Sequence, residues 1–306
     1  MSDTNSLPAD HAERMKRARL SFDGLSIGDG FGECFFTSGE LIEKWQKDRE
    51  PPPSPWFVTD DTMMAASIVR CLDRHGTVEQ DVLAKLFAAE FVREPMRGYG
   101  GGAVTILTAI SGGVSWKRAA RMVFGGQGSC GNGGAMRVAP IGAYFAEDYE
   151  RVAYEAKLSA EVTHAHPDGQ TGAMAVALAT AWMVTERKPN AAPDHTLIEF
   201  VLGHLPQTDT FNTLKKALKV PFEMPPHSAA RLLGNGSNVI SSDTVPFCLW
   251  CAARHQGNFT DALWSTVSGL GDRDTTCAIV GGIVSASAGR DGLPGNWLNA
   301  REIVRV

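Results

Sequence analysis

The chain has 306 residues, of which 43% are hydrophobic and 21% charged, and its formal net charge is −5. This apolar content suffices for a large buried core. The mildly acidic balance argues against nucleic-acid binding, which requires a basic face, and sequence-specific binding is not expected. The longest weakly polar runs, 172–184 and 277–288, are shorter than the roughly 18 to 20 residues that cross a bilayer. Since the N-terminus lacks the apolar centre of a secretory signal, we expect a cytoplasmic protein without a membrane segment.

Residues 1–14 are polar and predict a flexible N-terminal segment. From Met15 to the C-terminus, stretches with apolar residues at helical spacing follow one another, and alternating strand patterns are hard to find. We therefore predict one all-α domain over residues 15–306. The expected helices are 62–72, 80–91, 104–110, 134–145, 169–184 and 275–288.

The six cysteines are expected to be free thiols in a reducing cytoplasm. Cys248 and Cys251 form a CxxC pair, but a zinc site would need a second pair or suitably spaced histidines. We interpret the pair as two small core residues one helical turn apart. A redox role for it is a remote alternative.

A first acidic cluster, Thr59-Asp60-Asp61-Thr62, lies between a proline-rich loop at 51–55 and an expected helix. Asp or Thr at a helix N-terminus can accept hydrogen bonds from free backbone N–H groups. Capping does not account for two adjacent carboxylates, which repel unless a cation or solvent separates them.

A second cluster, with Asp272, Asp274 and Thr275, has the same pattern and opens another apolar helix. Together the clusters supply four carboxylates and several hydroxyls, which are hard oxygen ligands. Such ligands favour Mg²⁺ or Mn²⁺ over zinc. The number of carboxylates indicates two ions, which can activate a water molecule and neutralise charge on a substrate.

The stretch 125–137 contains six glycines and leads into an expected helix from Ala135. Exposed backbone amides and a helix N-terminus would stabilise an anion such as a diphosphate, although a glycine-rich turn can also be a simple hinge. The stretch is neither a P-loop nor a dinucleotide fingerprint, because it lacks Gly-Lys-Ser/Thr and a preceding strand. His164 and His166 follow in a loop, where ligand contact and a structural role are equally compatible with the pattern.

Five motifs, in this order, resemble the ADP-ribosylglycohydrolase family, which includes the dinitrogenase reductase activating glycohydrolase and the eukaryotic ADP-ribosyl-acceptor hydrolases. The motifs occupy residues 24–32, 59–62, 131–137, 163–167 and 271–275. The resemblance implies a compact all-α bundle with a central cleft for two Mg²⁺ (or Mn²⁺) ions. It also implies a hydrolase that removes ADP-ribose from an acceptor by cleaving the glycosidic bond at the distal ribose.

The resemblance assigns site residues as well. The implied metal ligands are Thr59, Asp60, Asp61, Asp272, Asp274 and Thr275. The residues implied to contact the diphosphate, the distal ribose or another part of ADP-ribose are Gly128, Ser129, Gly131, Asn132 and His164.

The sequence departs from the family pattern at three places: at Phe36, at Arg273 and in the stretch 233–246. The family often has a glutamate seven residues beyond the aspartate of its first motif, where this chain has Phe36; Glu33 is the nearby acid. The catalytic proton acceptor is therefore predicted to be Asp60, Asp61 or Glu33. Arg273 replaces a small residue between the two aspartates of the last motif, which we expect to alter substrate choice. The stretch 233–246 has no assignable function.

Two alternatives stay open. The chain can be a hydrolase of the same fold that acts on another ribosyl or nucleoside compound. It can also be a non-catalytic ADP-ribose-binding relative, which Phe36 favours and the four retained carboxylates disfavour. The sequence leaves open the acceptor linkage, the physiological metal and the oligomeric state, although a monomer is favoured.

Overall fold

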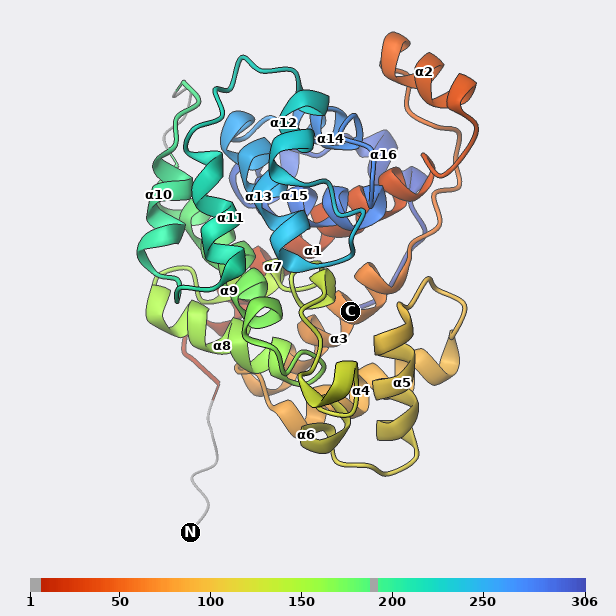
Figure 1. The fold of residues 1–306 in the computed structure, drawn as a ribbon, viewed down its shortest axis with the longest axis vertical. Coiled ribbons are helices and arrows are strands. Elements are labelled where there is room, and N and C mark those ends of the chain that lie inside the picture. Colours follow the sequence, from red (N-terminus) through yellow and green to blue (C-terminus); the bar gives the residue numbers. More distant parts are fainter. Residues whose placement is uncertain (1–6, 188–191) are drawn as a thin grey trace.

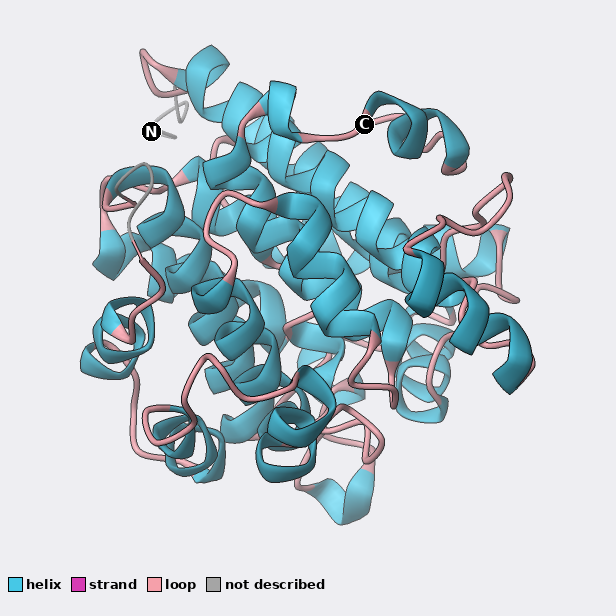
Figure 2. Ribbon diagram, turned by 90° about the horizontal axis from the view of Figure 1, so that it is seen from above, coloured by secondary structure: helices cyan, strands magenta, loops and turns pink. Residues whose placement is uncertain are grey.

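The computed structural model describes residues 7–187 and 192–306. Within these ranges the chain forms helices joined by loops and no strand, and only two isolated bridges, Trp56–Arg301 and Gly131–Ile240, pair extended backbone (Figure 2). The predicted all-α, single-domain architecture is confirmed. None of the described helices is long and apolar enough to span a membrane.

The helices of the first half are α1 (His11–Glu33), α2 (Gly39–Asp48), α3 (Asp60–His75), α4 (Gln80–Arg93), α5 (Gly101–Ser111), α6 (Trp116–Ala119), α7 (Ala139–Tyr144) and α8 (Tyr149–Glu161), with 3₁₀ turns η1 (Phe124–Gly126) and η2 (Asn132–Gly134). Those of the second half are α9 (Pro167–Thr185), α10 (Thr196–Gly203), α11 (Asp209–Ala217), α12 (Pro226–Leu233), α13 (Ser241–Arg254), α14 (Phe259–Val267), α15 (Arg273–Ala288) and α16 (Gly295–Ala300), with the 3₁₀ turn η3 (Arg290–Gly292).

Two sequence-based boundaries differ from the structure. Helix α1 begins at His11, so residues 11–14 are helical and not part of a loose segment; residues 1–6 of that segment lie outside the described residues. The helix expected from Gly134 onward begins only at Ala139. Pro140 explains this start, because its ring and missing N–H are tolerated in the first turn of a helix but disfavoured in its interior.

Helices α1 and α15 lie side by side in the middle of the molecule (Figure 1). Glycines at every fourth position of α1 let the backbones touch: a Cβ on Gly28 would lie 2.0 Å from the carbonyl oxygen of Cys277, and one on Gly32 would lie 2.2 Å from that of Arg273. A Cβ on Gly24 would instead meet Ser285. The helices are thus antiparallel, and the first turn of α15 lies beside the last turn of α1.

An aromatic cluster fixes the same end of α1. The ring of Phe31 stacks on Trp297 at 4.8 Å and meets Trp56 and Trp264 edge to face. Cys248 and Cys251 are buried free thiols on α13, as the core interpretation of the CxxC pair predicted. Helix α2, in contrast, lies at the edge of the molecule and buries none of its residues (Figure 1).

Candidate active site

The N-terminus of α3 is held by Asp29, a carboxylate of α1 with no solvent exposure. Asp29 accepts hydrogen bonds from the backbone N–H of Thr59 at 2.9 Å and that of Thr62 at 3.2 Å, and from both threonine hydroxyls. The Thr59 hydroxyl oxygen also lies 3.1 Å from Asp61 Oδ2. The first acidic cluster is therefore attached to α1 just before the end of that helix.

The N-terminus of α15 carries the second cluster. Asp272 is its N-cap residue and accepts a 2.7 Å hydrogen bond from the side-chain amide of Asn132, which belongs to the glycine-rich stretch. The Asn132 amide also donates to Thr244 Oγ1 at 3.1 Å. The predicted binding residue Asn132 and the predicted ligand Asp272 are thus in direct contact.

A cavity of about 550 Å³ joins the two clusters to the glycine-rich stretch. Of the predicted site residues, those that line it are Asp60, Asp61, Ser129, Gly131, Asn132, His164, Asp272, Asp274 and Thr275. Gly128 is not among them: it has a φ of +80° and packs against Ala165. The sequence predicted that an anion would meet both the amides of the turn and the N-terminus of a helix. No α-helix begins at Ala135, so only the amides of the turn are available.

Glu33 and Thr59 line a neighbouring cavity of about 590 Å³. Asp274 and Gly98 line both cavities, so the carboxylate clusters lie where the two meet. Phe57 and Met96, with exposed fractions of 63% and 92%, flank this second cavity. Glu33 and Asp274 thus face the same cavity.

The charge on each of these carboxylates affects the pKa of its neighbours. Burial, and secondarily the charges of the neighbouring carboxylates, raise the pKa of Asp60 and Asp61 well above the usual range. The same causes raise the pKa of Asp272 to about 7 and that of Asp274 to about 6. Burial also raises the pKa of Asp29 to about 6. So many buried acids in one place require protons or cations to coexist.

The donor set fits hard divalent cations. Asp61 Oδ1 and Asp274 Oδ1 are buried and have no hydrogen-bond partner in the described part of the chain. Unpaired carboxylate oxygens and nearby threonine hydroxyls are ligands that Mg²⁺ and Mn²⁺ accept. Among the described residues, no group of three or more His, Cys, Asp or Glu side chains is arranged so that it could hold a metal ion by itself.

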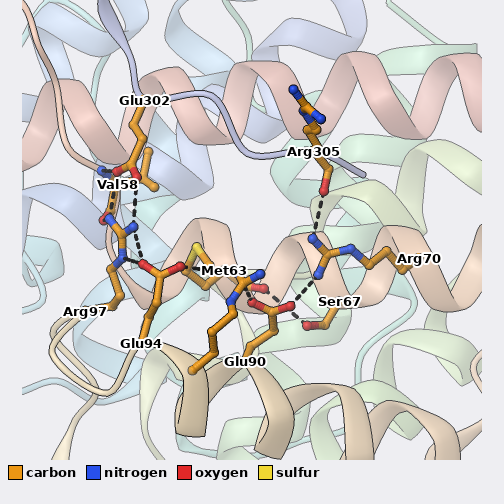
Figure 3. A network of polar contacts seen from close by, with 10 residues as sticks. Val58, Met63, Ser67, Arg70, Glu90, Glu94, Arg97, Glu302 and Arg305 are labelled. Atoms are coloured by element: carbon orange, nitrogen blue, oxygen red, sulfur yellow. Dashed lines mark hydrogen bonds and ion pairs between the residues drawn. The ribbon is translucent and has the colours of Figure 1, made fainter.

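An ion-pair network supports the first cluster from outside (Figure 3). The Arg97 guanidinium donates to the carbonyl oxygen of Val58 at 3.0 Å and to both carboxylate oxygens of Glu302 at 2.7 and 2.8 Å. The carbonyl oxygen of Arg97 in turn accepts a 2.7 Å hydrogen bond from the backbone N–H of Asp60. Arg97 is therefore hydrogen-bonded to the backbone on both sides of Thr59, at Val58 and at Asp60.

The stretch 233–246, to which the sequence assigned no function, connects the glycine-rich turn with the second cluster. The carbonyl oxygen of Val239 accepts from the N–H of Asn132, and that of Asn235 accepts from the N–H of Asp272. The Ser241 hydroxyl donates to the carbonyl oxygen of Gly131 at 2.9 Å. The stretch therefore forms a wall of the cavity and fixes both sides of the Asn132–Asp272 contact.

Two of the departures from the family pattern, Phe36 and Arg273, contact each other. The Arg273 guanidinium lies 4.4 Å from the ring centroid of Phe36 and donates to the carbonyl oxygen of Phe35 at 2.6 Å. Burial raises the pKa of Glu33, and the nearby charge of Arg273 opposes this rise. Arg273 thus fixes the segment that follows α1.

Sequence reasoning missed three residues of the site. Asp29 lies within the motif at 24–32, but the sequence did not assign it a role. Phe124 and Val239 line the cavity of about 550 Å³, which we call the main cavity. Their exposed fractions are 62% and 55%, and both have positive φ angles, 53° and 56°. Such angles are unusual for large side chains and cluster at ligand-binding sites. No sequence pattern predicts the positive φ angles of these two residues.

Comparisons with known proteins show which family the chain resembles. The family model of the ADP-ribosylglycohydrolases matches residues 10–305. The human ADP-ribosylhydrolase ARH3 is 28% identical, with 95% of this chain and 90% of that protein covered. The Gallus gallus ADP-ribosylhydrolase ARH3 is 31% identical over 78% of this chain and 72% of its own length.

A more distant relative, the ADP-ribosyl-[dinitrogen reductase] glycohydrolase of Rhodospirillum rubrum, is 23% identical over 92% of this chain and 89% of its own length. The fold matches a solved structure, an ADP-ribosylglycohydrolase-related protein complex, with a TM-score of 0.67, 23% identity and coverage of 95% and 94%. The fold and the relatives define the class of the protein, which is a glycosidase. The chain belongs to the ADP-ribosylglycohydrolase family, and the resemblance found in its sequence is confirmed.

Proposed function

We propose that this chain removes ADP-ribose from an acceptor by a hydrolysis that depends on two divalent ions, Mg²⁺ or Mn²⁺, and that cleaves the glycosidic bond at the distal ribose. One observation carries the proposal. Carboxylates from opposite ends of the chain line a single cavity together with the glycine-rich turn. Hard oxygen ligands and bare amides in one cavity suit a substrate that combines sugar hydroxyls with a diphosphate.

The lining residues suggest how the substrate lies. The distal ribose would occupy the carboxylate end, beside Asp60, Asp61 and Asp274. The diphosphate would accept hydrogen bonds from the backbone N–H groups of Cys130 and Gly133, which line the cavity. The N–H groups of Gly131 and Asn132 already donate to Ser129 Oγ and to the carbonyl oxygen of Val239. The exposed faces of Phe124 and Val239 offer apolar contact to the adenine base of ADP-ribose.

The reaction breaks one bond and forms another. A water molecule attacks the anomeric carbon of the distal ribose through an oxocarbenium-like transition state. The bond to the acceptor breaks, and the acceptor leaves with the electron pair and a proton. Asp60, Asp61 or Glu33 accepts the proton that the water loses. The departing acceptor takes up one proton in exchange, which returns the carboxylate to its starting state. When bound, the divalent ions supply positive charge that orients the ribose hydroxyls and lowers the pKa of the attacking water.

The proposal is tested by measuring release of ADP-ribose from arginine-, serine- and nucleic-acid-linked substrates, with Mg²⁺ or Mn²⁺ and with EDTA. We expect hydrolysis of at least one substrate that EDTA abolishes. D272A and D274A should each lower kcat/KM by about 10²-fold or more, the usual scale for losing a group that stabilises the transition state. D291A is the matched control, because Asp291 is an exposed aspartate of η3 outside the cavity.

Full activity of both D272A and D274A would show that the two-ion assignment is wrong. ADP-ribose binding in calorimetry without release from any substrate would instead support a non-catalytic binder. Hydrolysis confined to a nucleoside or another ribosyl compound would support the alternative substrate class.

A further inference from the structure

Three buried residues form a hydrogen-bonded chain behind the main cavity. Arg137, with 1% exposure, donates through Nη2 to the hydroxyl oxygen of Thr163 at 2.8 Å and to the carbonyl oxygen of Ser159 at 3.1 Å. The Thr163 hydroxyl oxygen lies 2.8 Å from Nδ1 of His164. The Arg137 guanidinium also packs on the ring of Phe87 at 4.3 Å, which fixes its plane.

The donors and acceptors of this chain can be assigned from chemistry. A guanidinium only donates, so the Thr163 oxygen must accept from Arg137. The threonine hydrogen then needs an acceptor, and in the described part of the chain the atom within hydrogen-bonding distance that can accept it is His164 Nδ1. If Nδ1 carried a hydrogen instead, the buried Thr163 hydroxyl would be left without an acceptor, which is costly. The satisfied arrangement places the ring hydrogen on Nε2.

The Nε2 side of the ring faces the cavity. His164 lines the cavity, and a Cβ on Gly131 or Gly133 would lie 3.5 or 3.3 Å from Nε2. The ring therefore lies against the bare α-carbons of the turn that we propose for the diphosphate. No hydrogen bond of Nε2 occurs within the described residues, so this donor is free to bind a ligand.

We propose that Arg137 and Thr163 are positioning residues that hold His164 in its Nε2–H tautomer, so that the imidazole serves as a hydrogen-bond donor to a substrate oxygen and not as an acid or base. The inference deepens the proposed function, because the oxygen belongs to a phosphate or ribose hydroxyl of ADP-ribose. Burial, and secondarily the charge of Arg137, lower the pKa of His164 to about 3, which agrees with a neutral ring.

The test is ¹⁵N NMR of the histidine rings in the full chain without substrate, with the His164 signals identified by their loss in H164Q. We expect a single Nε2–H tautomer whose shifts stay constant between about pH 5 and 8, unlike those of a freely titrating histidine. T163V, which removes the hydroxyl with little change of shape, should show averaged shifts of both tautomers. T163S should restore the signal of the unaltered protein.

Binding of ADP-ribose provides a second readout. T163V should weaken binding about threefold to tenfold, the scale of one neutral hydrogen bond, and T163S should recover most of that affinity. T180V is the matched control, because Thr180 is a buried threonine of α9 whose hydroxyl bonds to the carbonyl oxygen of Val176. It should leave the His164 signals unmoved.

An Nδ1–H tautomer in the unaltered protein, or identical spectra and affinities for T163V and T163S, would overturn the inference. The tautomer is read in the unaltered protein, so a T163V chain that fails to fold does not remove the test. The result is also separable from the proposed function: an Nε2–H tautomer without hydrolysis of any substrate would retain the inference about His164 and reject the activity.

Discussion

Asp29 is the residue on which the first acidic cluster depends. Its carboxylate accepts four hydrogen bonds from Thr59 and Thr62 and has no solvent exposure. A signal for it existed in the sequence: a carboxylate between Gly28 and Gly30, on a helix rich in small and apolar residues, is buried only with partners. The identity of those partners, thirty residues away, could not be read from the sequence.

The buried carboxylates predict an unusual pH dependence. The pKa values of Asp29, Asp272 and Asp274 are raised to about 6, 7 and 6. Between their unfolded values near 4 and these values, the folded chain binds more protons than the unfolded chain. Their contribution to the free energy of unfolding in EDTA therefore decreases as the pH rises from about 4 to 7. Urea unfolding at a series of pH values measures it.

The double variant D272N/D274N isolates the part of this contribution that comes from Asp272 and Asp274. Other groups oppose it, since hydrogen bonds from arginine lower the pKa of Asp10 and Glu302 and give the opposite slope. We expect the stability of the unaltered chain relative to the double variant to fall with rising pH. Mn²⁺ should restore more stability near pH 7.5 than near pH 5.5, because ligands must be deprotonated. A relative stability that increases with pH would contradict this account.

At the scale of elements, the contact between α1 and α15 places the second cluster. G28A would drive a Cβ to 2.0 Å from the Cys277 carbonyl oxygen, so the two helices must separate. We expect a loss of about 1 to 3 kcal/mol in the free energy of unfolding, the usual cost of overpacking, together with weaker Mn²⁺ binding as Asp272 and Asp274 move. Urea unfolding and calorimetry measure the two effects.

G39A is the matched control, because Gly39 opens helix α2 and a Cβ there meets nothing within 4 Å. It should change neither stability nor Mn²⁺ affinity appreciably. If G28A lowered stability but left the Mn²⁺ affinity at the G39A level, the α1–α15 spacing would not set the geometry of the second cluster.

Local patterns predicted the helices well and their exact starts less well. The predicted segments at 62–72 and 275–288 fall within α3 and α15, since apolar periodicity is strong there. The predicted start of α7 was wrong because Pro140 disfavours a helix interior at that point, although α13 accommodates Pro246 within its length. That the two acidic clusters share a cavity was predicted from their common pattern and the family resemblance. The wall formed by 233–246 was not predicted, because most of its contacts to Asn132 and Asp272 use backbone carbonyl oxygens or common hydroxyls, which have no distinctive sequence pattern.

At the scale of the whole molecule, the C-terminal segment supports the site. The segment after α16 pairs with the segment before α3: the N–H of Trp56 donates to the carbonyl oxygen of Ala300, and the N–H of Glu302 donates to that of Trp56. Glu302 then holds Arg97 (Figure 3). The carbonyl oxygen of Arg97 accepts a hydrogen bond from the N–H of Asp60. Residues near 60, 97 and 302 thus form one support for the first cluster.

This arrangement predicts that E302Q weakens metal binding without touching a ligand. An amide keeps the shape but loses the charge and one acceptor of the paired contact with Arg97, so Val58 and Asp60 are held less firmly. We expect Mn²⁺ affinity to fall about threefold to tenfold, within the range reported for coupling through packed networks. E13Q is the control, since Glu13 forms an exposed ion pair with Lys16, and exposed pairs contribute little. Equal Mn²⁺ affinities for E302Q and E13Q would mean that the C-terminal segment merely covers the molecule and does not position Asp60.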